Sequence, residues 1–274
     1  MLQPHRTDSG LKIYRSPLLE KIGVPHAFST RVGGMSPPPF NSLNLGLLGD
    51  SMLQDDLSNI HENYRHLRAV IGCEGRERCW VHQVHGVRVC TVRRRETFEN
   101  GLKADALVTD DPERLISVKY ADCVPVLLST VDGRVVAAIH SGWRGVVAGV
   151  VAAAVQSMVD LAGVAPQTLV AAIGPCIGFE HFEVGPEVLE SFVSLFGEDA
   201  PLRRVNEKGF VDLQEAVRRQ LMMAGLAEDQ IDGNDRCTFR DRDEFFSHRR
   251  EAGITGRMAG LIGPRSEPTF TLAR

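Results

Sequence analysis

The stretch from Cys123 to His140 reads CVPVLLSTVDGRVVAAIH and decides the fold of this chain. Two apolar runs, 124–131 and 134–139, flank the dipeptide Asp132-Gly133. Asp-Gly between apolar runs is typical of the tight type I′ turn that joins two antiparallel strands. The pattern therefore predicts a β-hairpin.

The register of this hairpin brings Cys123 close to His140. If Val131 faces Arg134 across the turn, His140 lies opposite Pro125. Cys123 shares a face with Pro125 because side chains alternate along a strand. Cys123 and His140 are then diagonal neighbours, with backbones roughly 7 to 8 Å apart. This separation suits two ligands of one metal ion, or a thiol beside a base.

A third ligand is needed for a catalytic zinc site, which keeps about three protein ligands and one open position. His85 is the best candidate, because it follows the apolar run 79–84 and precedes Gly86, where the backbone can turn. Spacing alone leaves another interpretation open, in which Cys123 packs as a small hydrophobic residue and both histidines are satisfied core or surface groups.

Short motifs along nearly the whole sequence match one protein family. They are STRVGG (29–34), SLNLG (42–46), QVHG (83–86), ADA (104–106), ADC (121–123), HSGWRG (140–145), IGP (173–175), FEVG (182–185), DRCT (235–238) and FSHRR (246–250). With these motifs in this order, the chain resembles the YfiH-like family, also called laccase-domain or multicopper polyphenol oxidase-like proteins. The resemblance implies a mixed α+β fold in a single domain, 1–274, with α-β-β-α layers built from duplicated β-α-β-β units. Flexible ends are expected at about 1–10 and 264–274.

The same resemblance implies a metal site and an activity. The family holds zinc through the histidine of QVHG, the cysteine of ADC and the histidine of HSGWRG, which are His85, Cys123 and His140 here. The implied activity is that of a zinc-dependent purine nucleoside phosphorylase, acting on adenosine, inosine, guanosine and methylthioadenosine, that also deaminates adenosine. The expected partners are purine nucleosides and phosphate. Copper is the alternative metal, since the same three ligands also suit Cu²⁺.

Further candidate residues lie around these motifs. The candidates for substrate or phosphate binding are Arg31, Asn44, Arg144 and Arg250. The arginines are chosen because a planar guanidinium binds phosphate oxygens through two hydrogen bonds. The candidate catalytic residues are Cys123, His140, Arg144 and Asp122.

Two carboxylates and two histidines complete the expected site. Asp105 and Asp122 are candidate partners of the ligands, because a metal-binding histidine usually donates its second ring N–H to a carboxylate. Capping a turn is the equal alternative for both. His82 and His248 are candidate proton carriers near neutral pH.

Composition limits the function classes. The 31 basic and 35 acidic residues give a formal net charge of −4, which offers no electrostatic footprint for nucleic acid or anionic membranes. No apolar run reaches the roughly 18 residues of a membrane span, and residues 1–10 lack the apolar core of a secretory signal. The six cysteines form no close-packed disulfide framework. We therefore expect a cytoplasmic enzyme that binds neither nucleic acid nor membranes, with no oligomeric state implied.

Hydrophobic periodicity and capping residues predict the remaining elements. Helices are expected at 55–71, 145–161, 186–196 and 212–224, and strands at 79–84, 106–109, 115–119 and 168–173 besides the hairpin. The helix at 145–161 would aim its N-terminus at the proposed site and favour an anion there.

Other chemistries remain open. A copper-dependent polyphenol oxidase with a trinuclear and a mononuclear centre needs about ten histidines, whereas the chain has nine. A thiol hydrolase or amidase would use Cys123 as nucleophile and His140 as base. A binding role without catalysis is a third alternative, although no sequence feature identifies a partner.

Overall fold

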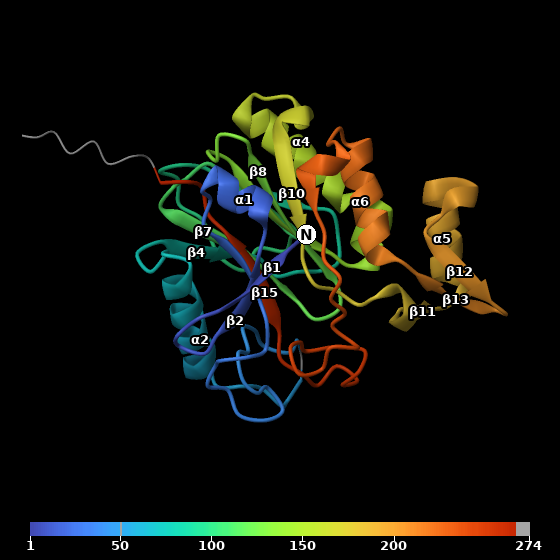
Figure 1. Cartoon of the computed structure of the whole chain (residues 1–274), viewed down its shortest axis with the longest axis horizontal. Helices are drawn as coiled ribbons and strands as arrows, with labels where there is room; N and C mark the ends of the chain where they lie inside the picture. The colour runs from blue at the N-terminus through green and yellow to red at the C-terminus, as the bar shows by residue number, and fades with distance from the viewer. Residues whose placement is uncertain (50, 267–274) are drawn as a thin grey trace, which may run out of the picture.

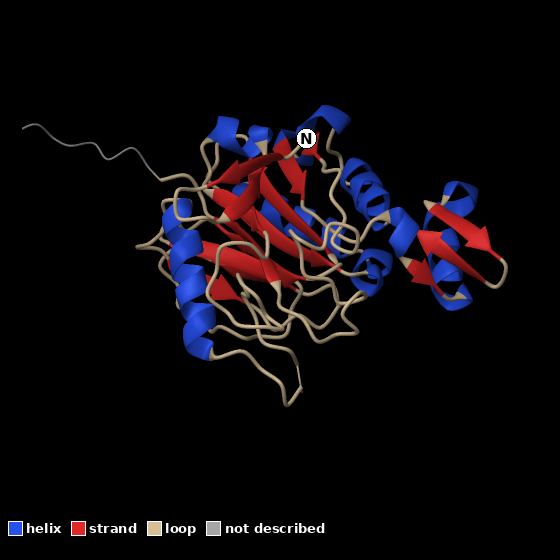
Figure 2. Cartoon of the chain, turned by 60° about the horizontal axis from the view of Figure 1, so that its bottom comes forward, coloured by secondary structure: helices blue, strands red, loops and turns tan. Residues whose placement is uncertain are grey.

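Two six-stranded sheets pack face to face, and helices cover the outer face of each (Figure 1, Figure 2). The computed structural model describes residues 1–49 and 51–266. Central strands of this chain are apolar on both faces, so each sheet needs a covering layer on each side. The α-β-β-α arrangement expected from the resemblance is confirmed.

The first sheet has the strand order β1-β2-β3-β15-β7-β4. Its strands are β1 (Gln3–Arg6), β2 (Lys12–Arg15), β3 (His26–Ser29), β4 (Glu77–Trp80), β7 (Arg114–Tyr120) and β15 (Met258–Ile262). Helix α2 (Leu57–Val70) covers the outer face, where Ile60, Tyr64 and Leu67 join Leu115 and Leu261 in one buried cluster. The helix predicted at 55–71 is therefore present.

The second sheet has the order β14-β10-β8-β9-β6-β5. Its strands are β5 (Val89–Val92), β6 (Ala106–Thr109), β8 (Val124–Thr130), β9 (Val136–Ser141), β10 (Leu169–Ile173) and β14 (Ile231–Asp232). Helices α4 (Val150–Ala162) and α6 (Leu213–Met223) cover its outer face. Along β8, Val126 and Leu128 pack with these helices, whereas Leu127 packs with the first sheet. Burial of each such side chain contributes about 1.5 to 3 kcal/mol to the stability of the fold. Strand β8 therefore stabilises the packing on both of its faces.

The predicted hairpin is formed by β8 and β9, and its register is confirmed because Pro125 lies opposite His140. The turn itself differs from the prediction. Gly133 has a φ of 74° and donates its N–H to the Thr130 carbonyl at 2.9 Å, whereas Asp132 lacks a positive φ. A type I′ turn needs positive φ at both central residues. The register persists because the Thr130 N–H donates to the carbonyl of Val135 at 3.0 Å.

The single helix predicted at 145–161 is in fact two helices. Helix α3 (Trp143–Ala148) ends at Gly149, whose φ of 90° breaks the helical path before α4 begins. Only a six-residue helix therefore follows His140, and the expected long dipole does not point at the site. The strand predicted at 79–84 is also shifted, since β4 ends at Trp80 and the chain beyond it turns toward the site.

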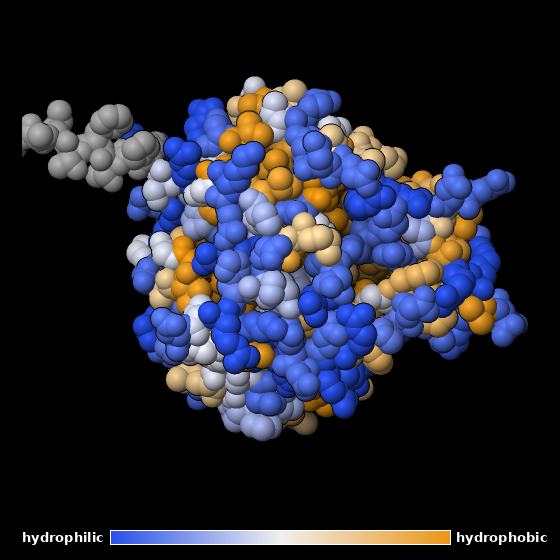
Figure 3. All heavy atoms as spheres, viewed as in Figure 1, coloured by the Kyte–Doolittle hydropathy of each residue, from blue (hydrophilic) through white to orange (hydrophobic). Residues whose placement is uncertain are grey.

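A smaller unit projects from one side of the sandwich (Figure 1). It contains β11 (Glu183–Val184), β12 (Leu202–Val205), β13 (Lys208–Val211) and helix α5 (Pro186–Phe196). Val188, Leu189 and Phe192 belong to the same buried cluster as α4 and α6, so the unit is continuous with the main core. Figure 3 shows that hydrophilic side chains cover most of one face, with apolar patches between them.

Shorter helical elements lie between the larger ones. They are helix α1 (Pro17–Ile22) and the 3-10 helices η1 (Pro166–Thr168), η2 (Phe179–His181), η3 (Gly197–Asp199) and η4 (Glu228–Gln230). Residues 1–10, expected to be a flexible end, include β1 paired with β2. Of the other expected flexible end, 264–274, the part from 267 onward lies outside the described residues. Within the described ranges, every helix is too short or too polar to cross a bilayer.

Candidate metal centre and pocket

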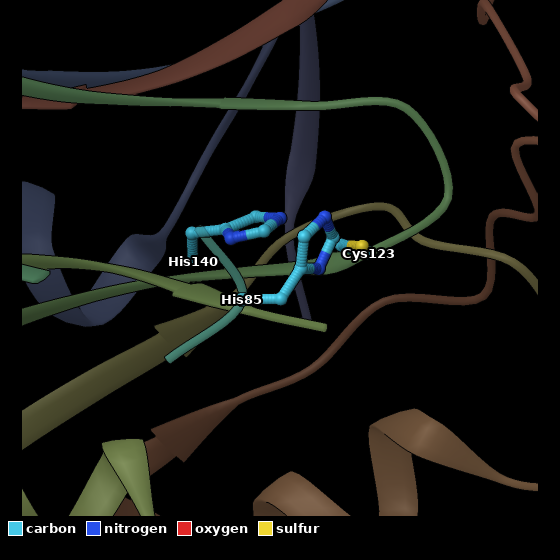
Figure 4. A group of neighbouring side chains, drawn as sticks. All are labelled: His85, Cys123 and His140. Carbon is cyan, nitrogen blue, oxygen red and sulfur yellow. The ribbon is translucent and has the colours of Figure 1, made fainter. Parts of the chain in front are cut away.

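His85, Cys123 and His140 converge on one point at the end of the second sheet (Figure 4). Their ligand atoms all lie within 4.8 Å of one another. His140 belongs to β9, Cys123 directly precedes β8, and His85 comes from the loop after β4. Among the described residues this is the one group of three or more potential ligands of these types. The structure thus brings together the three residues that the sequence assigned to a metal.

A single buried carboxylate, Asp105, holds both histidines. Its Oδ1 lies 2.9 Å from Nδ1 of His140. The same carboxylate accepts hydrogen bonds from the backbone N–H groups of Val84, His85 and Gly86 at 3.2, 2.9 and 2.7 Å. These bonds fix the loop in which His85 has a φ of 58°. Asp105 is therefore bonded to a candidate ligand histidine, as predicted, and this bond leaves Nε2 of His140 available to a metal ion.

Gly142 forms the floor beneath the ligands. A Cβ atom at this position would lie 2.5 Å from Nδ1 of His85 and 3.1 Å from Sγ of Cys123. Real Cβ atoms do not approach other atoms as closely as 2.5 Å. The glycine between His140 and Trp143 is therefore a condition for the three ligands to meet.

Cys123 and His140 shift each other's pKa. Burial raises the pKa of the Cys123 thiol, but the neighbouring rings of His140 and His85 outweigh it and lower this pKa below its ordinary value. Burial lowers the pKa of His140, but Cys123 and Asp105 together raise it above the ordinary value. The site favours a thiolate, which is the form of cysteine that binds metals.

Asp122 stabilises a loop instead of bonding to a ligand histidine. Its Oδ1 accepts a hydrogen bond from Thr238 at 2.6 Å, and its Oδ2 accepts bonds from the Ser247 hydroxyl at 3.1 Å and the Arg249 N–H at 2.6 Å. Asp122 also has a φ of 87°. It thereby attaches the segment 247–249, including His248, to the residue next to Cys123.

A pocket of about 750 Å³ opens over the three ligands. Apolar and aromatic residues form much of its wall: Leu45, Leu57, Ile60, Tyr64, Trp80, Trp143, Ile177 and Phe182. His82 and His248, the candidate proton carriers, also line it. Pockets of about 300 to 1,000 Å³ whose walls include apolar and aromatic side chains are typical of small-molecule sites.

The four candidate substrate or phosphate residues lie outside the pocket lining. Arg31 donates to the Asn41 and Arg242 carbonyls and stacks on Phe246. The Asn44 side chain is fully buried and bonded to Asp55 and to the N–H groups of Gly46 and Arg257. Arg144 is exposed, with its guanidinium 4.4 Å from the Trp143 ring. Arg250 donates to the carbonyls of Thr238, Phe239 and Phe245. These contacts tie Arg31, Asn44 and Arg250 to neighbouring segments of the chain, and substrate or phosphate binding by any of the four stays a prediction.

The pocket instead contains other cationic residues. Arg249, which belongs to the FSHRR motif and was one of the arginines considered for anion binding, lines it, and so do Arg78, Lys119 and Arg257, which the sequence reasoning missed. Lys119 is the last polar residue of a predicted strand, four residues before Cys123, and this position was a signal that could have identified it. Arg78 and Arg257 carry no motif of their own and reach the pocket only through the pairing of β4 and β15 with β7.

The fold and the site together define a family of two-sheet proteins with a His-Cys-His centre. A model of the family described as multi-copper polyphenol oxidoreductase laccase matches residues 25–265. The chain belongs to this family of YfiH-like proteins. It is 37% identical over 241 residues to the purine nucleoside phosphorylase YfiH of Escherichia coli, covering 88% of this chain and 93% of that protein.

One more curated relative and two solved structures support membership of the same family. A purine nucleoside phosphorylase of Deinococcus radiodurans is 37% identical over 262 residues, covering 95% of this chain and 96% of that protein. The crystal structure of YlmD from Geobacillus stearothermophilus has a TM-score of 0.84 at 31% identity, covering 96% of this chain and 98% of that one. The crystal structure of YfiH from Bacillus licheniformis has the same TM-score at 29% identity, covering 95% and 98%.

Proposed function

We propose that this chain is a zinc-dependent purine nucleoside phosphorylase that cleaves adenosine, inosine, guanosine and methylthioadenosine, and that it also deaminates adenosine. The observation that carries the proposal is the meeting of His85, Cys123 and His140 within 4.8 Å beneath the pocket. The curated relatives named above as purine nucleoside phosphorylases support the reaction class.

The ligand set fits zinc. Two imidazoles and one thiolate leave a fourth position open, as in catalytic zinc sites. Zinc held there would supply a Lewis acid and lower the pKa of a bound water toward about 7. His140 is oriented by Asp105, and the Gly142 floor keeps side-chain atoms out of the space between His85 and Cys123.

The walls of the pocket fit a purine nucleoside. The rings of Trp80, Trp143 and Phe182 offer flat apolar surface for a heterocyclic base. The ring nitrogens of His82 and His248 at the lining can give or take a proton as the base leaves. In phosphorolysis a phosphate oxygen forms a bond to the anomeric carbon. The glycosidic bond breaks, and its electron pair and one proton go to the purine.

Two other activities have weaker support. For a multicopper oxidase several metal centres are required, whereas the described residues contain one three-ligand group. For a thiol hydrolase, Cys123 needs to be free of metal, and the close approach of His85 to Cys123 favours shared ligation.

Product chromatography of the pure protein with adenosine tests the proposal. We expect adenine and ribose 1-phosphate only when phosphate is present, and inosine with or without phosphate. Adenosine that remains intact in all incubations of the zinc-loaded protein would contradict the proposed function.

A further inference from the structure

The pocket has an unbalanced positive charge. Among the described residues that line it are four lysine or arginine side chains, Arg78, Lys119, Arg249 and Arg257, and one carboxylate, Asp122. The Asp122 oxygens already accept three hydrogen bonds from the 238–249 segment. Partly buried cations without ion-pair partners are costly. A wall of this kind is suited to an anionic ligand.

Strand pairing explains why Lys119 and Arg257 are neighbours. In β7 and β15, Lys119 lies opposite Ala259 and Tyr120 lies opposite Met258. Continued by one residue, this register sets Arg257 opposite Ala121, so that Lys119 and Arg257 are diagonal neighbours on one face. The same diagonal relationship brings Cys123 to His140 in the hairpin.

Packing holds both side chains in place. A Cβ atom at Gly46 would lie 2.6 Å from the Cδ of Lys119 and 3.3 Å from the Cβ of Arg257, so the two stems pack closely over this glycine. The Arg257 guanidinium donates to the carbonyls of Thr255 and Gly256 at 2.8 and 3.1 Å through a single nitrogen, Nη1. Among the described residues, the Lys119 ammonium group has neither a hydrogen bond nor an ion pair; its nearest ring contact is Trp80, at 5.8 Å.

Arg78 is the third residue of this cationic wall, beside Lys119 and Arg257. Its guanidinium stacks 3.9 Å from the Tyr64 ring centre and donates to the Ser117 hydroxyl at 3.2 Å. Burial, followed by repulsion from Arg78 and Arg257, lowers the pKa of Lys119 to about 8. An anion beside Arg78, Lys119 and Arg257 would offset the repulsion among these three cations.

We infer that Lys119 and Arg257, with Arg78 behind them, form the subsite that binds the phosphate co-substrate. The inference rests on the proposed phosphorylase activity. Arg257 is near enough to the metal centre to interact electrostatically with Cys123 and Asp122. Phosphate at this wall therefore lies beside the space above the ligands, where its oxygen bonds to the anomeric carbon while the glycosidic electron pair leaves with the purine.

The Gln83 side chain connects the backbone of Lys119 to the loop that carries His85. Its side-chain amide donates to the Lys119 carbonyl at 2.7 Å and accepts from the Lys119 N–H at 2.8 Å. Gln83 is two residues before His85, so one side chain connects the cationic wall to a metal ligand.

The substitution Lys119→Met tests the subsite, with Lys119→Arg as the charge-preserving variant and Lys208→Met as the control. Lys208 is an exposed lysine that pairs with Glu183 on the projecting unit. We expect Lys119→Met to raise the KM for phosphate about 10- to 100-fold, as expected for loss of a charge-assisted bond. The KM for adenosine and the zinc content should stay within about threefold of wild type. Lys119→Arg should recover most of the phosphate affinity, and Lys208→Met should behave as wild type.

Calorimetric titration with inorganic phosphate provides a readout independent of turnover. If the zinc-loaded Lys119→Met protein binds phosphate more weakly than the wild type does, the subsite is supported, whether or not the wild type cleaves nucleosides. A wild type that binds phosphate but cleaves no nucleoside would contradict the proposed function and leave the subsite standing. An unchanged phosphate KM in an active, folded Lys119→Met protein would overturn the subsite alone. Weaker binding of adenosine monophosphate with unchanged binding of inorganic phosphate would also overturn it, because the wall would then hold a nucleotide's own phosphate.

Discussion

Oδ1 of Asp105 lies 2.9 Å from Nδ1 of His140, and both side chains are buried. The same carboxylate accepts the N–H groups of residues 84–86, so one side chain fixes two of the three proposed ligands. Burial alone would raise the pKa of Asp105, but the bonds from His140 and the loop lower it below the ordinary value. Asp105 is therefore a carboxylate at neutral pH.

Asp105→Asn should weaken zinc binding by about 10- to 100-fold, because the amide neither orients His140 as strongly nor satisfies the loop N–H groups as well. Competition with a chromophoric chelator measures this affinity. Asp132→Asn, on the exposed hairpin turn, is the matched control and should bind zinc as the wild type does. Equal zinc affinity for Asp105→Asn would contradict the role of this carboxylate.

Gly142→Ala should displace His85 or Cys123, because its Cβ would overlap His85 Nδ1. The expected cost is about 1 to 3 kcal/mol of unfolding free energy, with loss of bound zinc. Urea unfolding and metal analysis measure the two effects. Gly75→Ala is the control, since a Cβ at Gly75 meets nothing within 4 Å. Normal zinc content in Gly142→Ala would show that zinc binding does not depend on the space left by the missing Cβ of Gly142.

Asp122→Ala should destabilise the protein by about 2 to 5 kcal/mol, because three donors lose a charged acceptor. Asp122→Asn should cost less, since asparagine tolerates a positive φ and retains one acceptor oxygen. Urea unfolding of both variants beside Thr238→Val tests this order. Equal stability of the alanine and asparagine variants would contradict the anchoring role of Asp122.

Iodoacetamide labelling should distinguish bound from free Cys123. Because neighbouring histidines lower the pKa of this thiol, the metal-free protein should label with a midpoint below the ordinary thiol value of 9.0. Labelling should rise as pH increases through that lowered pKa and should be slow in the zinc-loaded protein. Cys79, whose pKa burial raises to about 11, is the internal reference. Peptide mass spectrometry measures both sites, and rapid labelling of Cys123 in the zinc-loaded protein would favour thiol hydrolase chemistry.

The hairpin could be predicted because its information is local. Apolar runs on both sides of Asp132-Gly133 set which residues pair, and the pairing of Pro125 with His140 followed despite a different turn. The break at Gly149 was missed because an isolated glycine is tolerated in many helices, whereas here its positive φ ends α3.

The cationic wall could not be predicted in the same way. Arg78 and Lys119 lie in β4 and β7, and Arg257 directly precedes β15. These segments are far apart in sequence and meet only because β4 and β15 flank β7. Candidate arginines were chosen for lying in motifs, but Arg31 and Arg250 use their guanidinium groups to hold backbone carbonyls of neighbouring loops. Long-range pairing, which a single sequence does not reveal, decides which cation faces the pocket.

The central claim is that His85, Cys123 and His140 bind one zinc ion at which nucleosides are cleaved. Zinc content and phosphate-dependent adenine release should be measured together for the wild type and Cys123→Ala, with Cys90→Ala as the control. We predict one zinc per wild-type chain, and in Cys123→Ala a loss of both zinc and adenine release while the control retains both. A folded Cys123→Ala protein that kept full zinc content and full turnover would contradict the claim.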